Sequence, residues 1–219
     1  MPKQTFLNLE EGKRKQFVDA FLREFSIKTF DEASITEVVK LLGIAKGSVY
    51  QYFESKLDLF LFLLQECVAV KMKYVATIER KDYADFWMYF RDLYVYGVQF
   101  DEENPLQSHF LHNLVNNLNS PSTKELYKEL EGQSVLAFEA MAKKEMELGL
   151  FRDDIPTQTI GFLLYKIGVS IQEEMEYSGA INPKESIQNN SPVYQGKQET
   201  LLKLVDQYIQ LVKPAFDKQ

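Results

Sequence analysis

Apolar residues recur at every third or fourth position over most of the chain, and no stretch alternates apolar and polar residues as a half-buried strand does. Helical spacing of this kind predicts an all-α protein of about nine helices. Prolines stand at several expected helix starts and glycines follow several expected ends, which sets the boundaries. The predicted helices cover residues 9–26, 34–42, 46–52, 56–79, 83–100, 105–117, 121–148, 157–177 and 197–212.

The segments between and inside these helices carry predictions of their own. Residues 1–8 are expected to form a loose arm, and the polar, Pro-containing stretch 179–196 is expected to be a loop or partly disordered. Pro214 is expected to end the last helix, and Phe30 to plug a core. The long fourth helix is expected to bury one face, made of Leu57, Phe60, Leu61, Leu64, Val68, Met72 and Val75.

The stretch 34–53 has the clearest local pattern. Ser34 and Glu37 have the spacing of a capping box at a helix start. Gly43 can end that helix because glycine adopts positive φ without steric cost. A second short helix follows at once, which matches a helix-turn-helix whose second helix enters the major groove of DNA. The same pattern also fits a capped helical hairpin inside any all-α protein.

Charge is divided unevenly along the chain. Residues 1–60 carry nine Lys or Arg and nine Asp or Glu, so they are neutral. Residues 61–219 carry 16 and 23, so the net charge of −7 lies entirely there. Phosphate would repel such an acidic body, whereas a neutral head can still present a local basic face. This asymmetry suits a DNA-binding protein whose bulk stands away from the duplex.

Cysteine usage and hydropathy bear on the compartment. Cys67 is the only cysteine, so no intrachain disulfide can form, which fits a reducing cytoplasm. No secretory signal is visible, and no apolar run approaches the roughly 18 residues that a membrane span needs. We therefore expect a cytoplasmic protein without a membrane partner.

One uninterrupted string resembles the DNA-binding signature of TetR-family transcriptional regulators. It runs Gly43-Ile44-Ala45-Lys46-Gly47-Ser48-Val49-Tyr50-Gln51-Tyr52-Phe53 and is followed by Lys56 and Leu59. The resemblance covers roughly the first 60 residues, and the rest of the chain has no comparable motif.

The resemblance implies that the second helix of the motif and its flanks face DNA. Gln51 is expected to read bases, because its amide can pair both exposed groups of adenine. Lys56 and Thr36 are expected to contact phosphate, which fixes register. Tyr52 stands where the family often has histidine, so base preference stays open. The full set of expected DNA contacts is Thr36, Lys46, Gly47, Ser48, Tyr50, Gln51, Tyr52 and Lys56.

The resemblance also implies a two-domain repressor that responds to a ligand. A helix-turn-helix domain over 1–56 would bind a palindromic operator, and a larger domain over 57–219 would bind an effector and dimerise. The expected homodimer interface uses helices 157–177 and 197–212. Its apolar stripe would be Ile160, Leu164, Ile167 and Ile171, although the same stripe could bury inside its own subunit.

Aromatic residues are the best candidates for an effector pocket, since such pockets are mostly apolar. A small apolar or aromatic effector would contact Trp87, Phe90, Tyr94, Phe110, Phe138 and Tyr165. His109 and His112 lack further ligands at metal-binding spacing, so no metal site is expected. No catalytic motif or cofactor signature appears either, so the chain is not expected to be an enzyme.

Two other classes stay open at this point. One is an all-α enzyme or small-molecule binder whose head is only structural. The other is a protein-interaction module that kept the fold and lost DNA binding. The intact string 46–56 argues against this second class.

Overall fold

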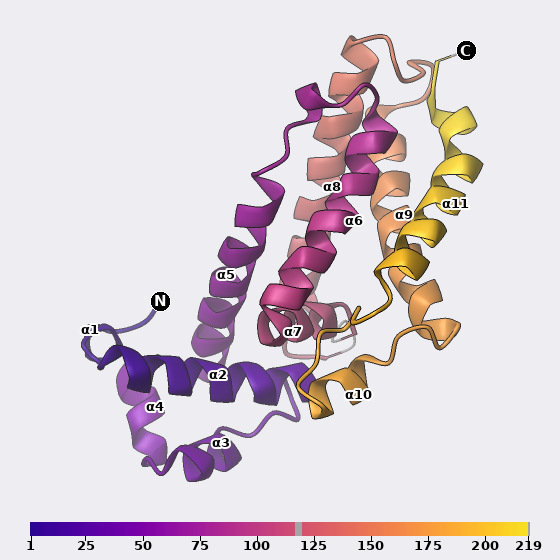
Figure 1. Ribbon diagram of the computed structural model, residues 1–219. Coiled ribbons are helices and arrows are strands. Elements are labelled where there is room, and N and C mark those ends of the chain that lie inside the picture. The colour runs from indigo at the N-terminus through magenta and orange to yellow at the C-terminus, as the bar shows by residue number, and fades with distance from the viewer. Residues whose placement is uncertain (117–119, 219) are drawn as a thin grey trace. The chain divides into compact units, whose positions relative to one another are not determined.

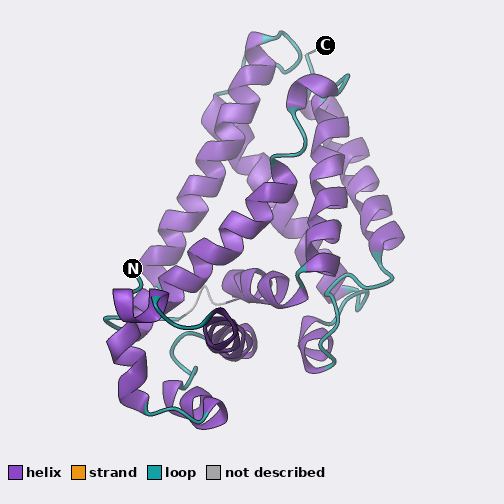
Figure 2. Cartoon of the chain, turned by 60° about the vertical axis from the view of Figure 1, so that its left-hand side comes forward, coloured by secondary structure: helices purple, strands orange, loops and turns teal. Residues whose placement is uncertain are grey.

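The computed structural model describes residues 1–116 and 120–218. Within these residues, every element of regular secondary structure is a helix (Figure 2). The elements in chain order are α1 Gln4–Leu7, α2 Glu11–Ile27, α3 Ile35–Leu42, α4 Lys46–Tyr52, α5 Lys56–Val75, the 3-10 helix η1 Arg80–Asp82, α6 Phe86–Glu103, α7 Pro105–Asn116, α8 Lys124–Glu147, α9 Thr157–Tyr177, α10 Pro183–Gln188 and α11 Gln198–Phe216 (Figure 1). The predicted all-α class is confirmed. The eleven α-helices of the described residues exceed the predicted nine because two short ones were missed.

The two missed helices lie where the sequence predicted an arm and a loop. Residues 1–8 do not form a loose arm, because they contain α1, whose Phe6 side chain is fully buried. The stretch 179–196 contains α10, with Ile187 buried on it and Val193 buried after it. Both are anchored by apolar contacts with distant parts of the chain, which local polarity does not reveal.

The last helix also extends beyond its prediction. Pro214 lies inside α11, which continues to Phe216. The Phe216 side chain is buried among other aromatic residues, and its carbonyl accepts a hydrogen bond from the backbone N–H of Arg152 at 2.9 Å. These tertiary contacts hold the final turn despite the donor that proline removes.

By packing, the described chain divides into two compact units. Unit 1 comprises Met1–Lys73, Phe100–Thr123 and Pro183–Val193, and unit 2 comprises the remaining segments. Helices α5 and α6 each contribute residues to both units. The functional division between residues 1–56 and 57–219 stays a prediction.

The core of unit 1 is built from phenylalanine. Ring contacts link α1, α2, α4 and α5, and Phe30 packs against Phe25 and Phe60 as the predicted plug. The predicted buried face of α5 is partly wrong, because Leu57, Val68 and Met72 are exposed. That helix is apolar on most of its circumference, so spacing alone does not select the side that packs. The fully buried side chains of α5 are Leu59, Phe60, Leu63 and Cys67, of which the prediction named only Phe60.

Unit 2 has its own aromatic core. Figure 1 shows α8 and α11 running alongside α9, and the buried cluster draws from α6, α8, α9 and α11. Arg80 of η1 donates to both carboxylate oxygens of the buried Glu145 on α8, each at 2.7 Å. In the part of the chain that the structure describes, no helix combines the length and apolar character needed to cross a bilayer.

The predicted apolar stripe of α9 is buried inside its own unit. Ile160, Leu164 and Ile171 are at most 2% exposed, and the first two belong to the core cluster of unit 2. The stripe is therefore not a free dimer surface, and the alternative held open above is the correct one. The exposed large apolar or aromatic side chains of these two helices are Phe162, Leu163 and Tyr177 on α9 and Leu211 on α11.

Gly161 sets how closely α8 and α9 approach, which gives a stability prediction. A Cβ at this position would lie 2.6 Å from the Glu139 backbone, so Gly161→Ala forces the helices apart. We expect the free energy of unfolding to fall by about 1–3 kcal/mol in urea denaturation. Gly132→Ala is the matched control on α8, where an added Cβ meets open space; it should be neutral or stabilise by up to about 1 kcal/mol. An unchanged midpoint for Gly161→Ala would contradict the close crossing.

Candidate nucleic-acid interface

Helix α3 begins and ends as its sequence predicts. The Ser34 hydroxyl accepts a hydrogen bond from the Glu37 backbone N–H at 3.3 Å, which caps the first turn. Gly43 ends the helix with φ of 66°, in the left-handed region. The chain can then reverse within three residues and start α4.

Helix α4 divides cleanly into a buried and an exposed side. Val49 and Phe53 are fully buried, as their spacing predicted. Tyr50 is 43% exposed, and Lys46 and Gln51 are exposed beside it. The exposed side thus carries a cation, an amide and a phenol, which are the groups that hydrogen-bond phosphate and base edges. Of the other predicted DNA contacts, Thr36 and Gly47 are exposed, and Ser48, Tyr52 and Lys56 are half-buried.

Tyr52 has partners inside the head. Its ring centroid lies 5.8 Å from that of Phe6 and 5.6 Å from that of Phe17, the latter with edge-to-face geometry. The side chain therefore anchors the end of α4 to α1 and α2. Its predicted contact with DNA stays a prediction.

Lys56 also has a partner inside the head. Its ammonium donates to the Ala33 carbonyl at 2.5 Å and lies 4.8 Å from the centre of the Phe30 ring. Partial burial lowers the pKa of Lys56 from its usual value. This contact ties the start of α5 to the loop before α3. The phosphate contact predicted for Lys56 stays a prediction beside this structural role.

Helix α7 braces the same head from a distant part of the sequence. The Asn113 side-chain amide donates to the carbonyls of Phe25 at 2.8 Å and Lys28 at 3.2 Å, at the end of α2. The Ser120 hydroxyl donates to the carboxylate of Asp31 in the loop between α2 and α3. Sequence reasoning missed these contacts because partners more than 80 residues apart leave no local pattern.

The two histidines lie in unit 1. Both are buried, and His109 Nε2 lies 2.9 Å from the carbonyl oxygen of Ser191. Burial lowers the pKa of His109, because the charged imidazolium loses solvation. In residues 1–116 and 120–218, no three His, Cys, Asp or Glu side chains gather as a metal site would require.

Comparison with known proteins places this head in a family. Residues 17–63 match the model of bacterial regulatory proteins of the tetR family. A solved TetR-family transcriptional regulator from Chloroflexus aurantiacus superposes over 100% of both chains with a TM-score of 0.80 and 26% identity. The N-terminal part of the chain is therefore similar to the DNA-binding head of TetR-family regulators. Two curated HTH-type regulators of Bacillus subtilis resemble its N-terminal part, YvdT with 43% identity over 56 residues and YdgC with 38% over 53. These matches span only 26% and 27% of those relatives, respectively.

The aromatic residues predicted to hold an effector do not form one group. Trp87 and Phe90 are buried in the core cluster of unit 2, with Tyr94 and Phe138 packed against it. The Trp87 indole donates to Asp217 at 2.7 Å, and burial raises the pKa of Tyr94.

The other two predicted effector residues lie elsewhere. Phe110 belongs to unit 1, with its ring 5.3 Å from that of Phe60. Tyr165, on α9, shares a hydrogen bond with Tyr127. The structure therefore brings four of the six predicted residues together, as parts of a packed core.

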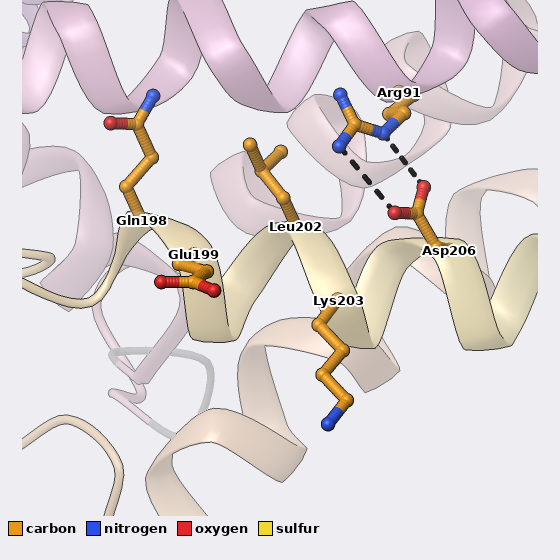
Figure 3. Close-up of a pocket in the computed structure, with 6 residues that line it drawn as sticks. All are labelled: Arg91, Gln198, Glu199, Leu202, Lys203 and Asp206. Atoms are coloured by element: carbon orange, nitrogen blue, oxygen red, sulfur yellow. Dashed lines mark hydrogen bonds and ion pairs between the residues drawn. The ribbon is translucent and has the colours of Figure 1, made fainter.

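A cavity of about 430 Å³ opens in unit 2 beside α6 and α11 (Figure 3). Arg91 of α6 donates to Asp206 of α11 at 2.7 Å across it. Leu202 is its one apolar lining residue, so it differs in character from the aromatic pocket that the sequence predicted. Its lining residues are Arg91, Gln198, Glu199, Leu202, Lys203 and Asp206.

The brace between the TetR-type head and the α7–α8 connection predicts an acid-sensitive contribution to stability. Hydrogen bonds from the side chains of Ser120 and Ser122 lower the pKa of Asp31 below its ordinary 3.8. A depressed folded-state pKa stabilises the fold at pH values above 3.8, and that contribution is lost as the pH falls through the lower folded value. In Asp31→Asn the group no longer titrates, so the free energy of unfolding should fall less steeply with acidification.

Urea denaturation from neutral pH down past 3.8 measures this slope. Glu66→Gln, which changes an exposed carboxylate of α5, is the control. Identical slopes for Asp31→Asn and the unaltered protein would show that the serine contacts do not stabilise the carboxylate.

Proposed function

We propose that this protein is a ligand-responsive, sequence-specific DNA-binding regulator of transcription. It acts as a repressor that leaves a palindromic operator when a small apolar or aromatic effector binds its body. The observation that carries the proposal is the exposed side of α4, which holds Lys46, Tyr50 and Gln51 on a TetR-type head. A regulator of this kind acts in the cytoplasm and needs no catalytic group.

The exposed residues have two kinds of role: some fix the position of the head on DNA, and one reads the base sequence. Gln51 reads a base in the major groove, because its amide donates and accepts at once. Thr36 on α3 and Lys46 at the start of α4 contact phosphate, which fixes the register of the head. Gly47 lets the backbone approach the duplex, and the Ser48 side chain faces it. Tyr52 and Lys56 contribute contacts from positions that also hold the head together.

A homodimer would present two such heads to a two-fold operator. We place the interface on α9 and α11, now through their exposed side chains. Phe162 and Leu163 on α9 are 46% and 45% exposed, and Leu211 on α11 is 77% exposed. Exposed apolar side chains on neighbouring long helices mark association surfaces.

Effector binding reaches the heads through helices that belong to both units. Residues 56–73 of α5 pack with the head, and its last two residues belong to unit 2. A ligand that prefers one arrangement of unit 2, near Trp87, Phe90, Tyr94 or Phe138, would bias the setting of this helix. The shift is limited by the difference in ligand affinity between the two settings.

The base contact of Gln51 is tested by discrimination between duplexes. Gln51→Ala should lose about 1–3 kcal/mol of preference for the operator over a copy altered at one base pair. Thr36→Val is the matched control, because it removes one exposed hydroxyl from a predicted phosphate contact. It should weaken binding to both duplexes alike. Titration by fluorescence anisotropy at fixed salt measures both ratios; equal losses on every duplex for Gln51→Ala would remove its role in base reading.

The dimer surface is tested by adding charge to it. Leu163→Glu and Leu211→Glu should convert the dimer to monomers at micromolar concentrations, because each buries a carboxylate without a partner. Met88→Glu is the control, since this residue is 54% exposed on α6, outside the proposed surface. Sedimentation velocity reports the mass of each variant. A dimer that survives both α9 and α11 substitutions would place the interface elsewhere.

A further inference from the structure

The end of α4 leaves carbonyl groups that the helix cannot pair by itself. The last four carbonyls of any α-helix lack an intrahelical donor. In α4 one of them, that of Val49, accepts from the Phe53 backbone N–H at 2.8 Å. The three others belong to Tyr50, Gln51 and Tyr52, whose side chains are among the predicted DNA contacts.

All three of these carbonyls accept a hydrogen bond from the N-terminal segment. The Lys3 ammonium donates to the Tyr50 carbonyl at 3.0 Å, and the Thr5 hydroxyl to the Gln51 carbonyl at 2.5 Å. The Lys3 backbone N–H donates to the Tyr52 carbonyl at 2.8 Å. A cation at the carboxyl end of a helix is also favoured by the helix dipole.

The segment is held in place by its own buried anchor. Phe6 is fully buried, and its ring centroid lies 5.4 Å from that of Phe17, 5.0 Å from that of Phe53 and 5.5 Å from that of Phe62. Lys3 also pairs with Glu54 at 2.9 Å, just after α4. The donors of Lys3 and Thr5 are therefore fixed to the same core as the buried side of α4.

We propose that residues 3–6 form a cap that sets the geometry of the DNA-reading helix, with Lys3 and Thr5 as positioning residues for sequence discrimination. The proposal rests on the proposed function of α4. Because the capped carbonyls belong to the base-reading Gln51 and to the residues on either side of it, loss of the cap loosens the last turn and the side chains on it. Discrimination between duplexes then falls, while general affinity for DNA, which comes from phosphate contacts elsewhere, changes less.

The test uses point variants of the full chain, because deleting the segment would also remove Phe6 from the core. Thr5→Val removes the hydroxyl and keeps the shape, whereas Thr5→Ser keeps the hydroxyl. Lys3→Met removes the ammonium and keeps most of the apolar stem. Gln4→Met is the control on the same segment, because the Gln4 side-chain amide donates to the side chain of Asn8 rather than to a carbonyl of α4.

Two measurements are made on each variant. The first is amide hydrogen exchange of residues 50–53 in the free protein, which should quicken by about five- to tenfold in Thr5→Val and Lys3→Met. The second is affinity for a duplex selected by the unaltered protein from a randomised pool, divided by affinity for a scrambled duplex of equal length. This ratio should fall about three- to tenfold in the same two variants. Thr5→Ser and Gln4→Met should keep both values near those of the unaltered protein.

The outcomes separate the cap from the function on which it rests. Unchanged exchange in Thr5→Val and Lys3→Met would overturn the cap whatever happens on DNA. Faster exchange with an unchanged affinity ratio would keep the cap and overturn its role in discrimination. If the unaltered protein selects no duplex, the proposed function and the role in discrimination both fail, and the exchange data still decide whether the cap exists.

Discussion

A helix of seven residues is far below the roughly 12 that an isolated helix needs to persist in water, so the shape of α4 depends on its surroundings. Its buried side supplies only two full anchors, Val49 and Phe53. The backbone at each end must therefore be fixed by other parts of the head. Gly43 fixes the turn before α4. Donors of the N-terminal segment form hydrogen bonds with the carbonyls of its last turn. The rest of unit 1 can be understood as support for this one element.

That support is mostly aromatic, which suits a small core. Phenylalanine rings bury large areas with few rotatable bonds, and their edge-to-face contacts add about 0.5–1.5 kcal/mol per pair beyond burial. Phe6, Phe17 and Phe53 form a mutually contacting trio beneath the end of α4. Phe21 and Phe25 continue these ring contacts from Phe17 to Phe60, which contacts Phe30 and, on α7, Phe110. An aromatic core of this kind lets the few polar residues on the exposed side of α4 keep a defined geometry although the helix is short.

The sequence predicted best what is decided within a few residues. The cap at Ser34, the turn at Gly43 and the inward side of α4 all rest on spacing that physical chemistry interprets directly. It failed where distant contacts override local pattern. α1 forms because Phe6 reaches a core built by α2, α4 and α5, and α11 continues past Pro214 because Phe216 is buried.

Apolar periodicity was a second source of error. It identifies the apolar face of a helix but does not tell whether the protein's own core or a partner subunit covers that face. On α9 the regular stripe that includes Ile160 and Leu164 serves the protein's own core, and the exposed Phe162 and Leu163 follow no clear period. Aromatic residues posed the same problem, since Trp87 and Phe90 pack as core in the structure. The exposed side of α4 was easier to predict for a physical reason. Burying a polar side chain without a partner is costly, so the spacing of the apolar Val49 and Phe53 indicated the buried side, and Lys46, Tyr50 and Gln51 lie exposed on the other.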